Sequence, residues 1–397
     1  MDLEKLKSIQ GAIQSESLDG WLFCNFRHRD PLADEILGLS PGASNSRFWF
    51  YAVPTAGEPQ KIAHAVEPEA LGTLPGEPHL YRSREELLAC LRRLAGKKWG
   101  CHFSDTIPAI SYLDAGTAAM LKEAGLLLAP GDSLIQRFKG LLNDAAIQSH
   151  ERTAAHLYEI VELSWAEVQK SFAENRPVYE GDIALIMSEE VKKRGLETRG
   201  VFVVAAGRNS GNPHYNYSAS STKKGALFAP GDVIQFDLWA KEHNGVYANG
   251  VYADISWVGV YGKTAAPEVE AAFSSIVESR EAALQFIEAE LAAGRRPTGA
   301  AVDRVAKQVL TARGFAAAMR HRTGHGIDSD VHGSGVNIDS VEFTDLRLLL
   351  DGACFSLEPG VYLPNFGMRT EINVYIKDGK HFVSGKERQT ALLRCTE

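Results

Sequence analysis

Four acidic residues of this chain stand inside short apolar runs of the kind that form buried β-strands. A buried carboxylate is costly unless it is paired with a cation or bound to a metal ion. A chain that buries four of them must bring positive charge to each, and this requirement constrains the fold more than any other feature of the sequence. The runs and their acids are 233–239 (VIQFDLW) with Asp237, 251–257 (VYADISW) with Asp254, 355–360 (FSLEPG) with Glu358, and 369–374 (RTEINV) with Glu371.

The first two acids are predicted to lie on one face of a hairpin. If Asn244 and Gly245 form a two-residue turn, Asp237 lies opposite Tyr252, and Asp254 follows two residues later on the same face. A single aspartate of this kind fits a strand end or a helix cap as well as it fits a metal ligand. The pair favours a shared site.

The last two acids are predicted to face each other across a second hairpin. A turn at Pro364 and Asn365 places Glu358 opposite Glu371. Like charges in opposed positions repel, so a cation must lie close to both. Either a salt bridge from Arg369 or a bound metal ion would offset this repulsion. The segment alone does not distinguish the two.

A histidine completes the set of candidate ligands. His325 stands between two glycines, in a turn that lets its imidazole approach other backbone closely. Four carboxylates and one imidazole form a hard, oxygen-rich set that favours Mn(II), Co(II), Fe(II) or Zn(II), and four carboxylates can bridge two ions. The residues therefore predict a hydrolytic centre with two divalent metal ions.

The pattern along the chain predicts two domains. Residues 1–140 alternate strand-like runs with helical stretches, which is typical of an α/β domain. From 134 to 172 the apolar spacing becomes helical, and beyond it helices mix with hairpin-connected strands. We therefore predict an α/β (α+β) chain with domains 1–140 and 141–397. The predicted strands are 20–26, 47–53, 61–65, 200–206, 233–239, 251–260, 354–357, 370–376 and 381–383, and the predicted helices are 84–94, 113–124, 183–193, 267–291 and 298–313.

The composition excludes several classes of partner. The formal net charge is −8, so nucleic acid, whose binding requires neutralising many phosphates, is not an expected partner. The five cysteines are odd in number and contain no C-x-x-C, which predicts a reducing compartment. No run reaches the roughly 18 apolar residues of a membrane span, and the N-terminus lacks a secretory-signal pattern. We expect a cytoplasmic protein without a membrane partner.

The order and local context of the candidate ligands resemble those of the pita-bread metallohydrolases, which include methionine aminopeptidase, aminopeptidase P, prolidase and creatinase. Asp237, Asp254 (in YADI), His325 (in GHG), Glu358 (in EPG) and Glu371 (in RTE) follow that family's order of Asp, Asp, His, Glu, Glu. The region before residue 139 is similar to the N-terminal domain of the aminopeptidase P, prolidase and creatinase branch. The resemblance implies a creatinase-like N-terminal domain (1–140) followed by a pita-bread catalytic domain (141–397).

The resemblance also implies roles for individual residues. Two metal ions, with manganese favoured over cobalt, iron and zinc, would be bridged by Asp254 and Glu371 and would supply hydroxide near neutral pH. Glu358, itself a ligand, would accept the proton of that water and pass it to the leaving nitrogen.

Three further residues are expected to act on the substrate or the ligands. The family's substrate-contacting histidines resemble His214, in NSGNPH, and His332, in DVH, and would stabilise the oxyanion. Arg369, on the same strand face as Glu371, would orient the carboxylates.

The expected reaction is hydrolysis of the N-terminal Xaa-Pro bond of a small peptide, by an aminopeptidase or a dipeptidase that forms a homodimer. Two departures from the family pattern leave other substrates open. Asp237 and Asp254 are 17 residues apart, more than is usual in the family, and His332 is followed by GSG rather than by an acidic or proline-bearing segment. The alternatives are hydrolysis of a small non-peptide amide or cyclic amidine, as in the creatinase-like branch, and a binding protein that keeps the fold without catalysis.

Overall fold

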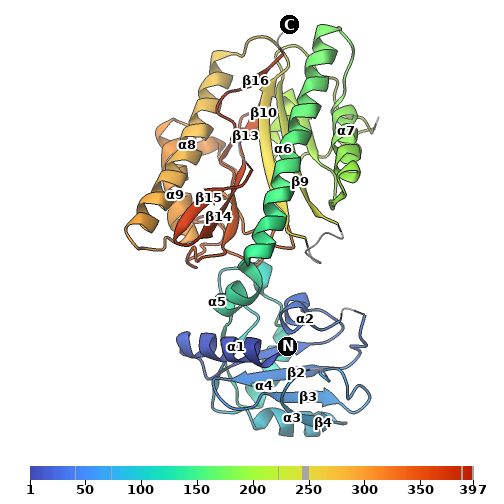
Figure 1. The fold of residues 1–397 in the computed structure, drawn as a ribbon, viewed down its shortest axis with the longest axis vertical. Coiled ribbons are helices and arrows are strands. Elements are labelled where there is room, and N and C mark those ends of the chain that lie inside the picture. Colours follow the sequence, from blue (N-terminus) through green and yellow to red (C-terminus); the bar gives the residue numbers. More distant parts are fainter. Residues whose placement is uncertain (41, 73, 222, 244–249, 386–387, 396–397) are drawn as a thin grey trace. The chain divides into compact units, whose positions relative to one another are not determined.

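The computed structural model describes residues 1–397 except 41, 73, 222, 244–249, 386–387 and 396–397. The chain forms two compact units, Met1–Lys139 and Gly140–Glu397 (Figure 1). Each unit has hydrophobic cores of its own. Within the described ranges, no helix is both long enough and apolar enough to cross a bilayer.

Unit 1 is a six-stranded mixed sheet, in the order β4-β3-β2-β1-β5-β6, with helices on both faces. On β1, Trp21 and Phe23 enter one core and Leu22 enters the other, because successive side chains of a strand point to opposite faces. Helices α1 and α2 pack into the first core, and α3 and α4 into the second. The bounds are α1 (Leu3–Ser15), β1 (Gly20–Asn25), α2 (Pro31–Leu37), β2 (Trp49–Pro54), β3 (Gln60–His64), β4 (Glu77–Tyr81), α3 (Arg84–Arg92), β5 (Lys98–Cys101), α4 (Ala115–Glu123), β6 (Leu127–Pro130) and α5 (Asp132–Ile135).

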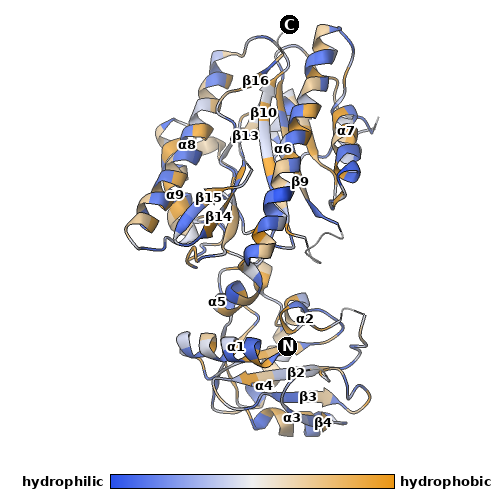
Figure 2. Ribbon diagram, in the orientation of Figure 1, coloured by the Kyte–Doolittle hydropathy of each residue, from blue (hydrophilic) through white to orange (hydrophobic). Residues whose placement is uncertain are grey.

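Unit 2 places two pairs of helices around its strands. Helices α6 and α7 pack on β8, β9 and β10, and α8 and α9 pack on β11 and β14 (Figure 1). The helices are two-sided, with hydrophobic and hydrophilic residues interspersed along α6 and α8 (Figure 2). Buried residues recur three and four apart on one face of a helix. On α6 these include Ala154, Leu157, Val161, Trp165 and Val168.

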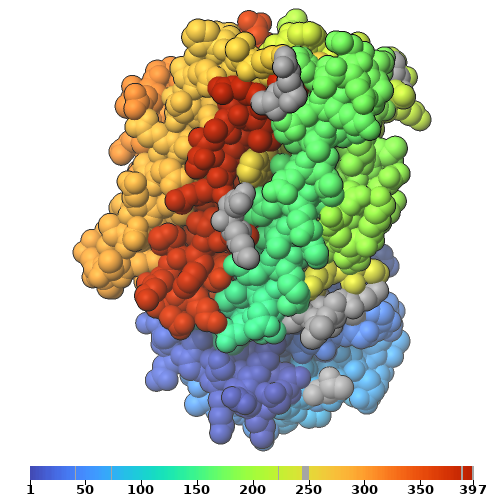
Figure 3. All heavy atoms as spheres, turned by 45° about the horizontal axis from the view of Figure 1, so that its top comes forward, coloured from blue at the N-terminus to red at the C-terminus, as the bar shows by residue number. Residues whose placement is uncertain are grey.

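The strands of unit 2 form three sheets. The largest has the order β16-β10-β9-β7 with β8 also paired to β9, and the others are β11-β14-β15 and β12-β13. The C-terminal strands, red in Figure 3, lie at the surface between α6 and α8. The bounds are α6 (Asp144–Ala173), α7 (Glu180–Lys193), β7 (Leu196–Glu197), β8 (Val203–Ala206), β9 (Val233–Glu242), β10 (Ala253–Val260), α8 (Pro267–Ala292), α9 (Gly299–Ala312), β11 (Cys354–Leu357), β12 (Gly360–Tyr362), β13 (Gly367–Arg369), β14 (Ile372–Lys377), β15 (Lys380–Val383) and β16 (Leu393–Arg394).

The helical pattern predicted from 134 to 172 is interrupted in the structure. A π-helical turn, Gln136–Gly140, precedes α6, which begins at Asp144. Leu142 donates its N–H to the carbonyl of Gly352, and Asn143 caps α6 by accepting from the N–H of Ala146 at 2.9 Å. Apolar spacing alone continues through such a cap, so it does not locate the helix start.

The register of the first hairpin differs from the prediction. Strand β9 continues to Glu242 and β10 begins at Ala253, so the connection is longer than the predicted two-residue turn, whose residues 244 and 245 lie outside the described part. Asp237 pairs with Ser256 instead of Tyr252. The shift is four residues, an even number, so Asp237 and Asp254 still share one face.

The register of the second hairpin is confirmed. Gly360 pairs with Arg369 between β12 and β13, and Leu357 pairs with Ile372 between β11 and β14. Glu358 and Glu371 occupy the opposed positions at the break between these two ladders.

Candidate metal centre

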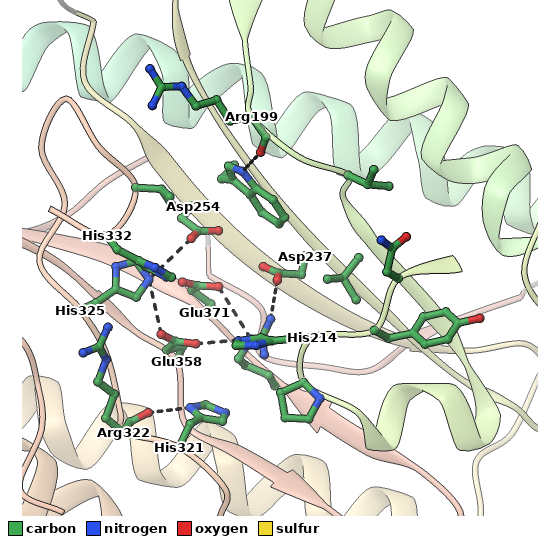
Figure 4. Close-up of a pocket in the computed structure, with 18 of the residues that line it drawn as sticks. Arg199, His214, Asp237, Asp254, His321, Arg322, His325, His332, Glu358 and Glu371 are labelled. Carbon is green, nitrogen blue, oxygen red and sulfur yellow. Dashed lines mark hydrogen bonds and ion pairs between the residues drawn. The ribbon is translucent and has the colours of Figure 1, made fainter. Parts of the chain in front are cut away.

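The structure brings the five candidate ligands to one place, at the junction of the unit 2 sheets. One ligand atom each of Asp254, His325 and Glu371 lies within 4.8 Å of the others, and all three residues are buried. Nε2 of His325 is 3.7 Å from Oδ2 of Asp254 and 3.5 Å from Oε1 of Glu358. Figure 4 shows these side chains turned toward a common centre.

Asp237 joins the cluster through a serine. The hydroxyl of Ser256 lies 2.9 Å from Oδ1 of Asp237 and 2.9 Å from Oε2 of Glu371. An isolated β-bridge between Ser256 and Glu371 connects β10 to the segment that separates β13 from β14. The two hairpins that carry the acids are therefore connected through Ser256 and Glu371.

Arg369 contacts three of the four carboxylates, as its predicted position beside Glu371 requires. Its Nη2 is 2.5 Å from Oδ2 of Asp237, and its Nε is 3.5 Å from Oε2 of Glu358 and 3.9 Å from Oε2 of Glu371. Nη1 donates to the phenol of Tyr362 at 3.1 Å. These contacts hold the guanidinium at one side of the cluster.

The arginine leaves part of the negative charge without a partner. Oδ1 of Asp254 and Oε1 of Glu371 are buried and have no hydrogen-bond donor among the residues that the structure describes. Buried carboxylate oxygens without donors are costly, and divalent cations bind such oxygens together with an imidazole nitrogen. The donor set fits a metal centre better than a salt bridge alone.

The charges of the cluster shift its protonation equilibria. Burial and the neighbouring carboxylates raise the pKa of Asp254 and that of Glu371 well above their usual values. Burial and the charge of His332 lower the pKa of His325 to about 3. Burial alone would raise the pKa of Glu358, but its electrostatic interactions with His321, His325 and Arg369 lower it to about 2. Glu358 is therefore an anion and the ring of His325 is neutral near pH 7.

Gly324 allows the His325 turn to approach β11, the strand that ends just before Glu358. The N–H of His325 donates to the hydroxyl of Ser356 at 3.0 Å, and the N–H of Ser356 donates back to the carbonyl of His325 at 2.9 Å. A Cβ on Gly324 would lie 1.9 Å from the carbonyl oxygen of Ser356. Only glycine permits this approach, as the sequence predicted for the turn.

The two histidines expected to contact substrate line the same cavity as the acids, a space of about 580 Å³. The ring of His332 is 4.3 Å from that of His325, measured between centroids, and nearly perpendicular to it. His214 lies on the segment that follows β8 (Figure 4). The surrounding protein and the charge of Arg322 lower the pKa of His332.

The sequence did not identify several polar neighbours of the ligands. Ser256, Ser356 and Asn373 each bond to a ligand residue or to its backbone, and each stands two residues from an acid in the chain. Residues two apart on a strand share a face, so this spacing was a usable signal. Trp239, two residues from Asp237 on β9, carried the same signal, and Tyr215 adjoins His214. The rest of the cavity wall was not identified from the sequence; it includes Arg199, Val201, His321, Arg322, Glu342 and Phe343.

Curated proteins of known or assigned activity resemble this chain in sequence. The chain is 28% identical over 249 residues to the Xaa-Pro dipeptidase of Lactobacillus helveticus, covering 62% of this chain and 60% of that protein. The first three matches to curated relatives span from about half to about two thirds of those proteins' lengths.

Solved structures share the fold along the whole chain. Dipeptidase PepE from Mycobacterium ulcerans superimposes with a TM-score of 0.71 at 20% identity, over 99% of this chain and 97% of that one. The prolidase of Thermococcus sibiricus superimposes with a TM-score of 0.65 at 22% identity, over 99% of each chain. These neighbours confirm the predicted α/β (α+β) fold of the pita-bread type.

The model of one protein family, described as metallopeptidase family M24, matches residues 146–378. The match includes every candidate ligand from Asp237 to Glu371, as well as His214 and His332, and it confirms the resemblance found in the sequence. Because it covers more than half of the 397 residues, the chain belongs to metallopeptidase family M24.

Proposed function

We propose that this protein is a metal-dependent hydrolase that cleaves the N-terminal Xaa-Pro peptide bond of small peptides, as an Xaa-Pro dipeptidase or aminopeptidase. The observation that carries the proposal is the convergence of four carboxylates, three of them buried, and one neutral imidazole on a cavity, with two carboxylate oxygens lacking any donor among the described residues. The choice of an Xaa-Pro bond is supported by the named activity of the Lactobacillus helveticus relative.

Five residues would hold two divalent cations in this cavity: Asp237, Asp254, His325, Glu358 and Glu371. The acids favour a hard ion, with Mn(II) preferred and Co(II), Fe(II) and Zn(II) also compatible with the donors. When bound, such ions supply hydroxide at neutral pH by lowering the pKa of water.

The side chains around the ligands would perform the remaining steps. Glu358, an anion beside His325, accepts the proton of the attacking water at a carboxylate oxygen and delivers it to the leaving nitrogen. His332 and His214 donate hydrogen bonds to the substrate carbonyl as it becomes an oxyanion. Arg369 keeps Asp237 and Glu358 oriented through its two contacts.

The first test is peptide hydrolysis by protein that has been stripped with chelator and refilled with Mn(II). The substrates are Xaa-Pro dipeptides and Xaa-Pro-Xaa tripeptides, with Xaa-Ala peptides of the same lengths as controls for proline preference. An Asp254→Asn variant, which loses one ligand, controls for contaminating peptidase.

The outcomes separate the candidate functions. Metal-dependent cleavage of tripeptides supports an aminopeptidase, and cleavage of dipeptides alone supports a dipeptidase. If metal binds and no peptide is cleaved, the peptidase proposal fails, and small amides and cyclic amidines become the substrates to screen. If no metal binds at neutral pH, the alternative of a binding protein on the same fold replaces it.

We also propose that the protein works as a cytoplasmic homodimer. The five cysteines are free thiols, which agrees with a reducing compartment, and the dimer follows from the resemblance to the family. Light scattering at working concentration tests the dimer, and a monomer there would refute it.

A further inference from the structure

A buried glutamate outside the ligand set gathers hydrogen bonds from the segment that carries His214. Glu180 is the first residue of α7 and is fully buried. Its Oε1 accepts from the N–H of Ala206 at 2.8 Å and from Nδ2 of Asn209 at 2.9 Å. Its Oε2 accepts from the phenol of Tyr215 at 2.7 Å and from the N–H of Ala226 at 2.6 Å.

The four donors lie between the end of β8 and residue 226 of the connection that leads to β9. Ala206 ends β8, and Asn209 lies in the turn Gly207–Gly211. Ala226 is the last of the four donors along the chain. Gly225 has a φ of +71°, and a Cβ there would lie 2.1 Å from Oε2 of Glu180. The backbone of residues 206–217 and of Gly225 and Ala226 thus packs around one carboxylate.

Tyr215 links this carboxylate to the cavity. It directly follows His214 and lines the same cavity, and its phenol also accepts from Nδ2 of Asn209 at 2.9 Å. Burial and the charge of Glu180 raise the pKa of Tyr215, so the phenol remains a donor at any working pH.

His214 has no comparable anchor of its own. Its main-chain N–H donates to Oδ1 of Asn212 at 3.1 Å, but within the described part of the chain no group hydrogen-bonds to its imidazole. The position of the ring therefore depends on the backbone of its segment, and that segment is hydrogen-bonded to Glu180.

We propose that Glu180 is a positioning residue, which holds residues 206–217 in the conformation that presents His214 to the substrate. It touches no substrate itself and acts through His214. This inference rests on the proposed hydrolase function for its kinetic test, but its structural test does not.

Glu180→Gln is the informative variant. Each carboxylate oxygen accepts one main-chain N–H, so either orientation of the amide turns its NH₂ group against a backbone donor. A displacement of a catalytic group by about 1 Å costs on the order of 10²-fold in rate, and we expect a loss of kcat/KM of that order, limited by the loss in His214→Ala. Glu189→Gln, the same change at an exposed site of the same helix, is the matched control and should leave the rate unchanged.

A double-mutant comparison distinguishes positioning from a general loss of structure. If Glu180 acts through His214, the variant Glu180→Gln/His214→Ala has the kcat/KM of His214→Ala alone. Glu180→Gln combined with His332→Ala should instead multiply the two separate losses, because His332 lies on a different segment. Losses that multiply in the His214 pair overturn the proposal.

Hydrogen exchange gives a readout that needs no activity. In the metal-loaded protein, Glu180→Gln should speed the exchange of amides in residues 207–217 and leave α6 unchanged; unchanged exchange in 207–217 overturns the proposal. If the wild-type chain cleaves no peptide, the hydrolase proposal fails while this measurement still decides the role of Glu180.

If Glu180→Gln does not fold, Tyr215→Phe is the second variant, because it removes one of the four hydrogen bonds to Glu180. It should speed amide exchange in the same residues to a smaller extent, and unchanged exchange would overturn the proposal.

Discussion

At the scale of single residues, the site carries more negative charge than its cationic side chains balance. Arg369 lies against Asp237 and near Glu358 and Glu371, while Asp254 keeps an oxygen without a donor among the described residues. One guanidinium cannot offset four carboxylates, three of which are buried. A divalent cation bound in this cluster would offset the remaining negative charge.

Removal of the proposed proton acceptor should stop turnover. Glu358→Gln keeps the size of the side chain and removes its ability to accept a proton, so kcat should fall by about 10²–10⁴-fold. The three-residue cluster of Asp254, His325 and Glu371 remains, so metal analysis should still find bound ion. Glu342→Gln, in the same cavity wall, serves as a control. A near-normal rate in metal-loaded Glu358→Gln would contradict the assignment.

Metal binding should release protons. The pKa values of Asp254 and Glu371 are raised well above their usual range, so without a cation these acids retain protons at higher pH, and a cation must displace them. Affinity therefore increases as pH rises through the raised pKa values. His325, with a pKa of about 3, is already neutral and contributes no proton. Calorimetric titration with Mn(II) in two buffers of different ionisation enthalpy measures the release, and identical heats would refute it.

At the scale of elements, the site depends on where strands meet and how closely their backbones approach. The acids lie at the junction of β10 with the β13–β14 segment, and the His325 turn is bonded to the strand before Glu358. Alternation along strands predicted which side chains share a face, and it remained correct for Asp237 and Asp254 although the register was wrong. An even shift in register keeps each side chain on the same face of the sheet. The two acids were therefore predicted to share a face correctly.

The Gly324 contact can be tested by adding one carbon. In Gly324→Ala the new Cβ would overlap the carbonyl of Ser356, and overpacking of this kind costs about 1–3 kcal/mol or more. We expect that loss in urea unfolding of the metal-free protein, together with weaker Mn(II) binding because His325 moves. Gly262→Ala, whose Cβ would meet its neighbours at 3.6 Å or more, should change neither. Equal stability of the two variants would show that the turn adjusts freely.

At the scale of the whole molecule, the chain consists of two units with separate cores, and every candidate ligand belongs to the second. A metal ion bound only to folded unit 2 stabilises that unit by mass action. The cores of unit 1 contain no ligand residue, so its own stability has no direct dependence on metal.

Chelator should therefore shift one of two unfolding transitions. At a free metal concentration of 100 Kd, binding contributes about 2.7 kcal/mol, and its removal should lower the Tm of unit 2 by roughly 5–10 °C. Scanning calorimetry measures the shift, and hydrogen exchange assigns each transition to a unit. Asp254→Asn should show little response to metal. Equal shifts of both transitions would mean that the units do not unfold independently.

The sequence by itself predicted the candidate ligands and the family to which the chain belongs. Acids in apolar runs and a histidine between glycines are local patterns that indicate candidate ligands, and alternation along the strands predicted their shared faces. The order of these candidates resembles that of the family, and this resemblance favoured a metal site over a salt bridge. The second hairpin register was also predictable, because a short turn determines pairing.

Features that depend on contacts between distant segments became visible only in the tertiary structure. The longer first hairpin, the cavity wall with Arg322 and Phe343, and the tie between Glu180 and the His214 segment join residues that are far apart in the chain. Local pattern carries no information about such contacts, because they form only when several elements pack together and each satisfies the polar groups of another.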